Sequence, residues 1–134
     1  MSADDLAVVS NKDAISVNQA WAGFAGDMLN YSLYPPKNAT EHNVTQVPEL
    51  SVWWKPLPNS SAAAVLFNKG GASATISFGF SELQWQGTRA LKSDQGCHVR
   101  SIWDGGKEVG IFNDGYSVRV NGSSVFFAIV SNCI

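Results

Sequence analysis

The sequence is poor in charged residues, and it lacks long hydrophobic runs. Only 15% of its 134 residues are charged, and the formal net charge is −2. A chain without a basic patch has no electrostatic basis for binding nucleic acid, because it cannot neutralise phosphates. The longest dense apolar cluster, residues 124–130, is much shorter than the roughly 18 residues of a membrane helix, so we expect no membrane span.

Residues that could hold a metal or carry nucleophilic catalysis are also few. The two cysteines and two histidines never occur at metal-ligand spacing. No G-x-S-x-G motif and no glycine-rich phosphate-binding loop occurs. Most acidic residues lie in predicted caps and turns, and no spacing singles out a carboxylate pair for glycoside hydrolysis. We therefore expect no catalytic residue, no cofactor and no metal site in this chain.

The chain does contain short apolar segments separated by turn residues. Two apolar runs between residues 50 and 67 flank the turn sequence at 58–61 and predict a β-hairpin. Alternation in the first run places Val52 and Trp54 on the core side. The second run is apolar on both faces, which suits a strand covered on both sides. Its small alanines would leave room for the Trp54 ring.

The rest of the chain continues this pattern. Further strands are predicted at 23–33, 75–80, 97–103, 107–112, 116–121 and 125–130, with an exposed loop at 37–49 and a ragged strand or packed loop at 81–95. We expect Val109, Ile111 and Trp103 on inward faces, a hairpin turn at 113–115, and the last strand in a central position. Turn signals every 8–12 residues predict an all-β fold, an antiparallel β-sandwich with Greek-key-like connections, for residues 23–134.

Residues 1–22 are expected to form a helical segment instead. Ser2 with Asp5, and Ser10 with Asp13, match the capping-box pattern that opens a helix. The second helix would present Ile15 on its packed side and end near residue 23. Both helices are too short to be stable alone, so they need a surface on which to lie.

Asparagine sequons indicate the compartment. Five asparagines fit N-x-[ST] without an intervening proline: Asn30, Asn38, Asn43, Asn59 and Asn121. We expect N-glycosylation and a secreted or lysosomal location in the lumen of the secretory pathway. There Cys97 and Cys133 would form a disulfide, the alternative being two unrelated buried thiols. Residues 1–20 do not resemble a signal peptide, so we expect that Met1 is not the natural start.

Five tryptophans leave a carbohydrate-binding interpretation open. Trp21, Trp53 and Trp85 could stack on sugar rings if they are exposed. The alternative is that the tryptophans fill the core, because their large rings suit a sandwich interior.

Three stretches resemble the α-galactosidase (melibiase) family of retaining glycoside hydrolases: residues 10–19 (SNKDAISVNQ), 52–57 with 64–68 (VWWKPL and AVLFN), and 99–104 (VRSIWD). The first is similar to the final helix of that family's catalytic barrel, and the others to strands of its C-terminal β-sandwich. Residues 2–130 follow the family in order. Two acidic positions of the family pattern are occupied here by Ala20 and Ser101.

The resemblance implies that catalysis and structural support belong to different parts of the enzyme. In that family the nucleophile and the acid/base are aspartates at the ends of barrel strands, and no position here corresponds to either. The implied function is that of a non-catalytic C-terminal portion of an enzyme hydrolysing terminal α-galactosides, supporting a catalytic barrel that would precede Met1. The alternatives are a barrel-less structural or interaction subunit that binds another protein chain, and a stand-alone carbohydrate-binding module.

Overall fold

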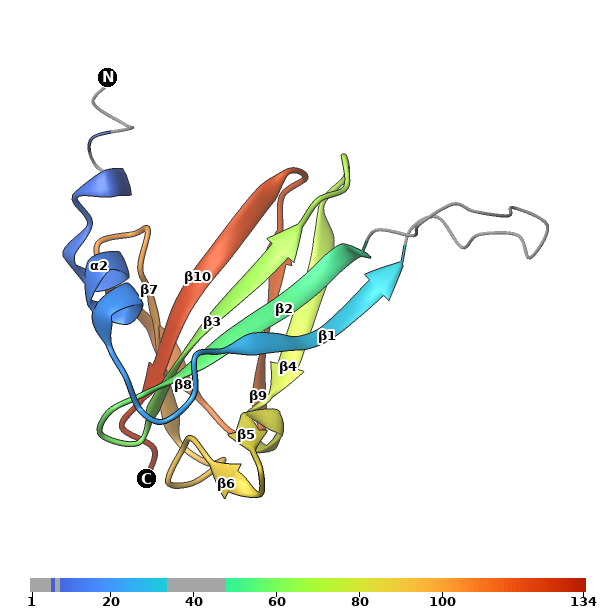
Figure 1. Cartoon of the computed structure of the whole chain (residues 1–134). Coiled ribbons are helices and arrows are strands. Elements are labelled where there is room, and N and C mark those ends of the chain that lie inside the picture. Colours follow the sequence, from blue (N-terminus) through green and yellow to red (C-terminus); the bar gives the residue numbers. More distant parts are fainter. Residues whose placement is uncertain (1–5, 7, 34–47) are drawn as a thin grey trace.

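A computed structural model describes residues 6, 8–33 and 48–134 (Figure 1). The strands are β1 (Asp27–Leu33), β2 (Pro48–Leu57), β3 (Ser61–Asn68), β4 (Ala74–Gly79), β5 (Gln84–Trp85), β6 (Thr88–Arg89), β7 (Cys97–Ser101), β8 (Lys107–Phe112), β9 (Gly115–Val120) and β10 (Ser124–Ser131). An α-helix, α2 (Lys12–Gln19), precedes them, and a 3-10 turn, η1 (Phe80–Glu82), follows β4. The prediction of an all-β sandwich preceded by a short helical segment is confirmed.

The two layers of the sandwich differ in size. One is a six-stranded antiparallel sheet in the order β1-β2-β3-β10-β7-β8, and the other is the β4–β9 pair. Strands β5 and β6 form a separate small ribbon. The predicted hairpin is β2–β3, and the predicted central strand is β10, which lies between β3 and β7. The turn at 113–115 is not a hairpin turn, because it carries the chain from β8 in the large sheet to β9 in the other layer.

The core lies between these layers. It is built from inward residues of both: Val52, Trp54, Ala62, Ala64, Leu66, Val99, Ala128 and Val130 from the large sheet, and Ile76, Phe78, Tyr116 and Val120 from the small one. Trp54 stands opposite Ala64 in the β2–β3 register, and only 5% of it is exposed. The small alanine therefore leaves space for the indole, as the alternation of large and small residues predicted.

The side chains of strand β8 that were predicted to point inward point outward instead. Val109 and Ile111 are exposed, at 43% and 54%, and do not enter the core. In the β7–β8 register the fully buried Val99 stands opposite Gly110. Opposite residues of antiparallel strands share a face, so Gly110 takes the inward position and its neighbours turn outward. The alternation of β8 alone could not reveal this, because the register is set by β7.

Trp103 is also not inward. It follows β7 in the turn before β8, is 39% exposed, and contacts Phe127 edge to face with ring centroids 5.5 Å apart. Phe127 belongs to the face of β10 that points away from the core between the layers, since its neighbours Phe126 and Ala128 point into that core. Trp103 therefore covers the outside of the large sheet.

Helix α2 begins one residue later than predicted. Its N-cap is Asn11, not Ser10, and the Asn11 side chain accepts a hydrogen bond from Ala14 N at 3.0 Å. The helix ends at Gln19, and its buried residue is Val17, while Ile15 is exposed. Tertiary contact decides this orientation, because Val17 meets the outer face of the large sheet. The helix predicted from Ser2 begins outside the described residues.

That contact forms a second apolar cluster. Val17 packs against Ala63, Ile102 and Ile129, with Ala14, Leu57 and Phe127 at its margin. The six-stranded sheet therefore has apolar contacts on both faces, with the β4–β9 layer on one side and α2 on the other. This explains how an eight-residue helix, too short to be stable in isolation, is held in place.

A disulfide joins Cys97, at the start of β7, to Cys133, just after β10. The two residues are 36 positions apart in the sequence. The bond ties the C-terminal end of the chain to the six-stranded sheet.

We expect the double variant Cys97→Ala/Cys133→Ala to lose about 4 kcal/mol of unfolding free energy, because opening a loop of this length restores entropy to the unfolded chain. Urea denaturation followed by tryptophan fluorescence measures the loss. Wild-type protein treated with dithiothreitol should show a similar loss, and the variant should not respond to the reductant. Equal midpoints for the oxidised wild type and the variant would contradict a stabilising role.

We expect Asn11→Ala to lower the unfolding free energy by about 1 kcal/mol, because it removes the N-cap acceptor. The same change removes the bond from the Asn11 side chain to Ile102 O. Thermal unfolding measures the stability, and hydrogen exchange at the amides of the first helical turn locates the effect. Lys12→Ala is the matched control, since Lys12 is exposed on the same helix. An equal loss in both variants would disprove the capping role.

Candidate functional site

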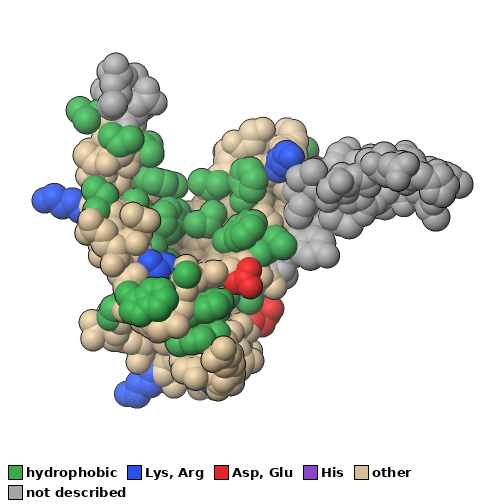
Figure 2. Space-filling view, viewed as in Figure 1, with side chains coloured by type: hydrophobic (Ala, Val, Ile, Leu, Met, Phe, Trp, Pro, Cys, Tyr) green, Lys and Arg blue, Asp and Glu red, His purple; other side chains and the backbone are tan. Residues whose placement is uncertain are grey.

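The outer face of the six-stranded sheet is only partly covered. Helix α2 lies over Ala63 and Ile129, but Trp53 of β2, Val65 of β3 and Phe127 of β10 extend beyond it. Figure 2 shows apolar side chains gathered around a hollow on this side of the molecule. We call this the outer-face groove.

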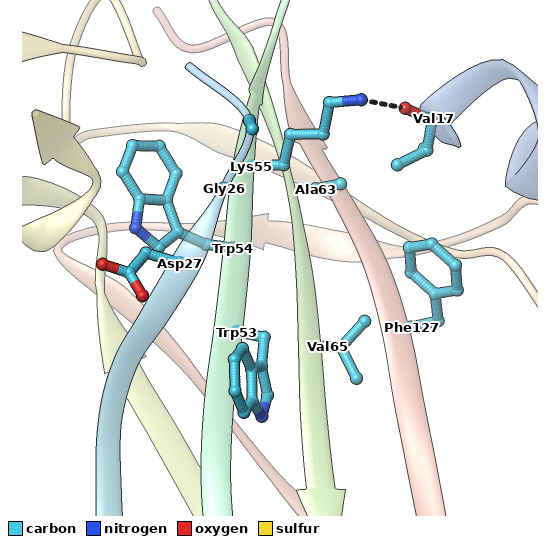
Figure 3. A pocket seen from close by; sticks show the side chains of 10 residues that line it. Val17, Gly26, Asp27, Trp53, Trp54, Lys55, Ala63, Val65 and Phe127 are labelled. Atoms are coloured by element: carbon cyan, nitrogen blue, oxygen red, sulfur yellow. Dashed lines mark hydrogen bonds between the residues drawn. The ribbon is translucent and has the colours of Figure 1, made fainter. Parts of the chain in front are cut away.

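The outer-face groove contains a pocket of about 350 Å³. Val17, Ala25, Gly26, Asp27, Trp53, Trp54, Lys55, Ala63, Val65 and Phe127 line it. Figure 3 shows how Trp53, Val65 and Phe127 come from three adjacent strands. Because each of these strands is paired on both sides, the floor of the groove is held in position by the sheet.

Exposed tryptophans lie at the groove and near it. Trp53 is 45% exposed at the groove, and Trp103 contacts the groove residue Phe127. Aromatic rings are enriched where proteins bind other proteins, and a contiguous exposed apolar surface on a folded domain is uncommon. The groove therefore has the composition of a contact surface.

Lys55 forms one wall of the groove, and its ammonium donates hydrogen bonds to backbone carbonyls of α2. Its Nζ donates to Val17 O at 2.7 Å (Figure 3), and it also donates to Asn18 O at 3.3 Å. These carbonyls belong to the last turn of α2, where the helix leaves its carbonyls without helical partners and where a cation is favoured by the helix dipole. Lys55 thus anchors the C-terminal end of α2 to β2.

Two further polar groups of the groove bind within the chain. Asp27 Oδ1 accepts from Met28 N at 2.7 Å, and Trp53 Nε1 donates to Ser51 Oγ at 3.0 Å. A small-molecule site normally presents a few convergent polar groups to its ligand. Because most of the lining residues are apolar, the floor suits an apolar protein surface better than the hydroxyls of a sugar.

Charged residues lie at the β7–β8 side of this face. Arg100 Nη1 lies 3.7 Å from Asp13 Oδ2 of α2, and His98 Nδ1 contacts Glu108 Oε1. Arg100 and Glu108 stand opposite each other in the β7–β8 register. An apolar centre with charged residues at its margin is the usual arrangement of a protein interface.

The three tryptophans with a predicted sugar-stacking role lie in different settings. Trp85 stacks on Phe24, with ring centroids 5.9 Å apart, and lies 6.0 Å from the Trp54 ring. Trp21 is 67% exposed and follows α2. Trp53 lines the outer-face groove, and its sugar-stacking role stays a prediction, as do those of the other two.

A second hollow, of about 690 Å³, lies over β4 and β9 and contains two carboxylates, Glu82 and Asp114. Glu82 Oε1 accepts from Gly79 N at 2.7 Å, and both residues are exposed. Burial raises the pKa of the Tyr116 phenol, which also lines this hollow, above its ordinary value. A glycosidase acid typically lies in an apolar site, whereas both of these carboxylates are open to solvent.

The remaining acids of the described residues mostly bind groups of their own chain. Asp94 lies 3.9 Å from Arg89, and Asp104 accepts from Ser101 Oγ at 2.7 Å. No group of three or more metal-ligating side chains is found among residues 6, 8–33 and 48–134. Within the same part of the chain, no helix has the length and hydropathy to cross a membrane.

The predicted glycosylation sites lie in different settings. Asn59 and Asn121 are exposed, at the β2–β3 and β9–β10 turns. Asn30 belongs to β1, but its side chain is not among those described, and Asn38 and Asn43 fall outside the described residues. Their occupancy stays a prediction.

The sequence did not predict the outer-face groove. A signal was present, because both faces of β3 and β10 are apolar although only one of them faces the sandwich interior. That excess of apolar residues predicts a second contact, but it does not indicate how much of the outer face α2 would cover.

Comparison with known proteins identifies the domain. Residues 47–130 match the family described as the alpha galactosidase C-terminal beta sandwich domain. The chain is 29% identical over 97 residues to alpha-galactosidase 2 of Arabidopsis thaliana, an alignment that covers 72% of this chain and 19% of the plant protein. The chain thus spans about a fifth of that relative.

Solved structures have the same fold. Alpha-galactosidase I from Mortierella vinacea superposes with a TM-score of 0.76 at 16% identity, covering 99% of this chain and 30% of that one. Alpha-galactosidase from Saccharomyces cerevisiae, solved with raffinose, gives 0.68 at 14% identity and covers 92% and 36%. The family match covers more than half of the chain, so this protein belongs to the family of α-galactosidase C-terminal β-sandwich domains.

Proposed function

We propose that this chain is the non-catalytic C-terminal portion of an α-galactosidase-like glycoside hydrolase and that its outer-face groove receives a preceding catalytic barrel. The parent activity would be hydrolysis of terminal α-galactosides. The observation that carries the proposal is the exposed apolar face around Trp53, Val65 and Phe127, which α2 covers only in part.

The position of α2 supports a barrel as the partner. Residues 10–19 resemble the last helix of the barrel in this family, and α2 lies on the same face as the groove. Elements that follow one another in a chain usually pack as neighbours. If α2 ends the barrel, the adjacent barrel elements would cover the remainder of this face.

The bonds around α2 make it a suitable rigid connection between the sandwich and a preceding barrel. Asn11 bonds Ile102 O, Asp13 lies near Arg100, and Lys55 holds the last turn. These contacts connect both ends of the helix to the sheet. A barrel that includes this helix would therefore be held at a defined orientation relative to the sandwich.

The carboxylates support a non-catalytic role. The acids considered above are exposed or bonded within the chain, and the family's catalytic aspartates belong to barrel strands. The catalytic groups would then come entirely from the barrel.

The disulfide and the sequons support passage through an oxidising secretory lumen, and thus a secreted or lysosomal enzyme.

A barrel-less interaction subunit is the second candidate. The same apolar face favours it, because any protein surface of matching shape could cover the groove. The two candidates differ in what precedes residue 1, so sequencing the transcript upstream of Met1 separates them. A coding sequence for about 250 residues of barrel supports the first candidate, and its absence supports the second.

We expect the chain alone to show no turnover of a chromogenic α-galactoside, because it would lack the nucleophile and the acid/base. The assay measures release of the chromophore against a buffer blank. Turnover that is lost in Glu82→Gln or Asp114→Asn would contradict the proposal and place chemistry in the hollow over β4 and β9.

We expect Trp53→Thr to lower the fluorescence of a bound apolar dye such as bis-ANS, because it removes the largest exposed ring of the groove. Trp21→Thr is the matched control, since Trp21 is more exposed than Trp53 but does not line the groove. Equal dye binding by the wild type and both variants would count against the groove as a contact surface.

A further inference from the structure

The tip of the β2–β3 hairpin shares a hollow with the C-terminal end of the disulfide. Asn59, Ser60, Lys92, Asn132 and Cys133 line this hollow, whose volume is about 300 Å³. Figure 1 shows the β2–β3 turn and the C-terminus at the same end of the molecule. We call the hollow lined by these residues the hairpin-tip hollow.

We propose that Asn59 carries an N-linked glycan whose first sugar lies in the hairpin-tip hollow and shields the Cys97–Cys133 disulfide. The inference rests on the secretory passage included in the proposed function. It is independent of whether a barrel or another protein covers the outer-face groove.

The setting of Asn59 suits an acceptor. Its φ is +65°, a left-handed conformation that asparagine tolerates better than most residues. It is exposed, and its side-chain amide has no hydrogen-bond partner among the described residues. Asn121 differs in that its Oδ1 accepts from Ser73 Oγ at 3.3 Å, which fixes the orientation of its amide. The Asn59 amide has no such restraint, and its Nδ2 can be modified without breaking a bond of the fold.

The hydroxyl residue of the sequon lies in the same turn. Ser61 Oγ donates to Pro58 O at 2.7 Å, so the sequon is part of a tight and ordered hairpin tip. In the transfer, Asn59 Nδ2 forms a bond to C1 of the first sugar of a lipid pyrophosphate-linked oligosaccharide. The C1–O bond to the pyrophosphate breaks, and the amide nitrogen loses one proton.

The hairpin-tip hollow offers the first sugar polar partners. The Lys92 ammonium can donate to sugar hydroxyls, and the Asn132 amide can donate or accept. Cys133 lines the hollow, whereas its partner Cys97 is fully buried. A thiolate that attacks the disulfide from solvent therefore approaches on the Cys133 side, where a sugar would obstruct it, since exchange depends on access to the sulfur.

The experiment uses the full 134-residue chain, expressed behind a cleavable signal sequence in a eukaryotic host. Lysate and medium are both analysed, so that retention in the cell does not prevent the test. Peptide N-glycosidase converts a glycosylated asparagine to aspartate, and mass spectrometry locates the conversion. We expect conversion at Asn59 and loss of one glycan from the Asn59→Asp variant. Ser60→Ala, which keeps the sequon, should retain it.

Absence of a glycan at Asn59 in both fractions would overturn the proposal, while leaving the barrel-support function and its galactosidase assay untouched. Shielding is tested separately by the rate at which dithiothreitol reduces the disulfide. Each dithiothreitol is oxidised to its cyclic disulfide as Cys97 and Cys133 become thiols, which iodoacetamide then traps.

We expect slower reduction in the glycosylated wild type than in Asn59→Asp. The enzyme converts every occupied sequon to aspartate, so deglycosylated wild-type protein should match a variant that carries aspartate at all five sequon asparagines. Equal rates in all of these samples would show that the glycan does not cover the disulfide. Thermal unfolding of each sample excludes a difference in stability as the cause.

Discussion

The structure depends on one constraint, which is that β3 and β10 are apolar on both faces and both faces must be kept from water. The inner faces, with Leu66 and Val130, are covered by the β4–β9 layer. The outer faces present Ala63, Val65, Phe127 and Ile129, and α2 covers only part of them. Since burial of apolar area is the dominant favourable contribution to folding and association, the uncovered part is a cost to the isolated chain, and this cost is the physical basis of the proposed contact with a barrel.

The same constraint explains why a short helix is retained in front of a sandwich. An eight-residue helix is marginal in water, but α2 gains the apolar contact of Val17 and three polar attachments, through Asn11, Asp13 and Lys55. The sheet orders the helix, and the helix in turn closes one side of the groove. The proposed supporting role needs such a rigid connection, because a flexible one would not fix the orientation of a barrel.

Much of the fold could be predicted because local patterns agreed with it. The β2–β3 hairpin, the inward alternation of Ile76 and Phe78, and the central place of β10 all follow from residues close in sequence. The predictions failed where neighbours in space decided the outcome. Val109 and Ile111 turn outward because β7 sets their register. Trp103 lies on the outer face because its ring packs edge to face against the ring of Phe127. Asn11 displaces Ser10 as N-cap, and its side chain also bonds Ile102 O, a residue remote in sequence.

The sequence by itself determined the fold class and the family resemblance, because periodicity, turn residues and short motifs are local properties. Only the tertiary structure decided that the outer face of the large sheet stays partly open, that Trp85 packs inward against Phe24 while Trp53 does not, and that Asn59 and Cys133 share one hollow. These features join residues far apart in the chain, and their proximity comes from strand order and register, which no local pattern specifies.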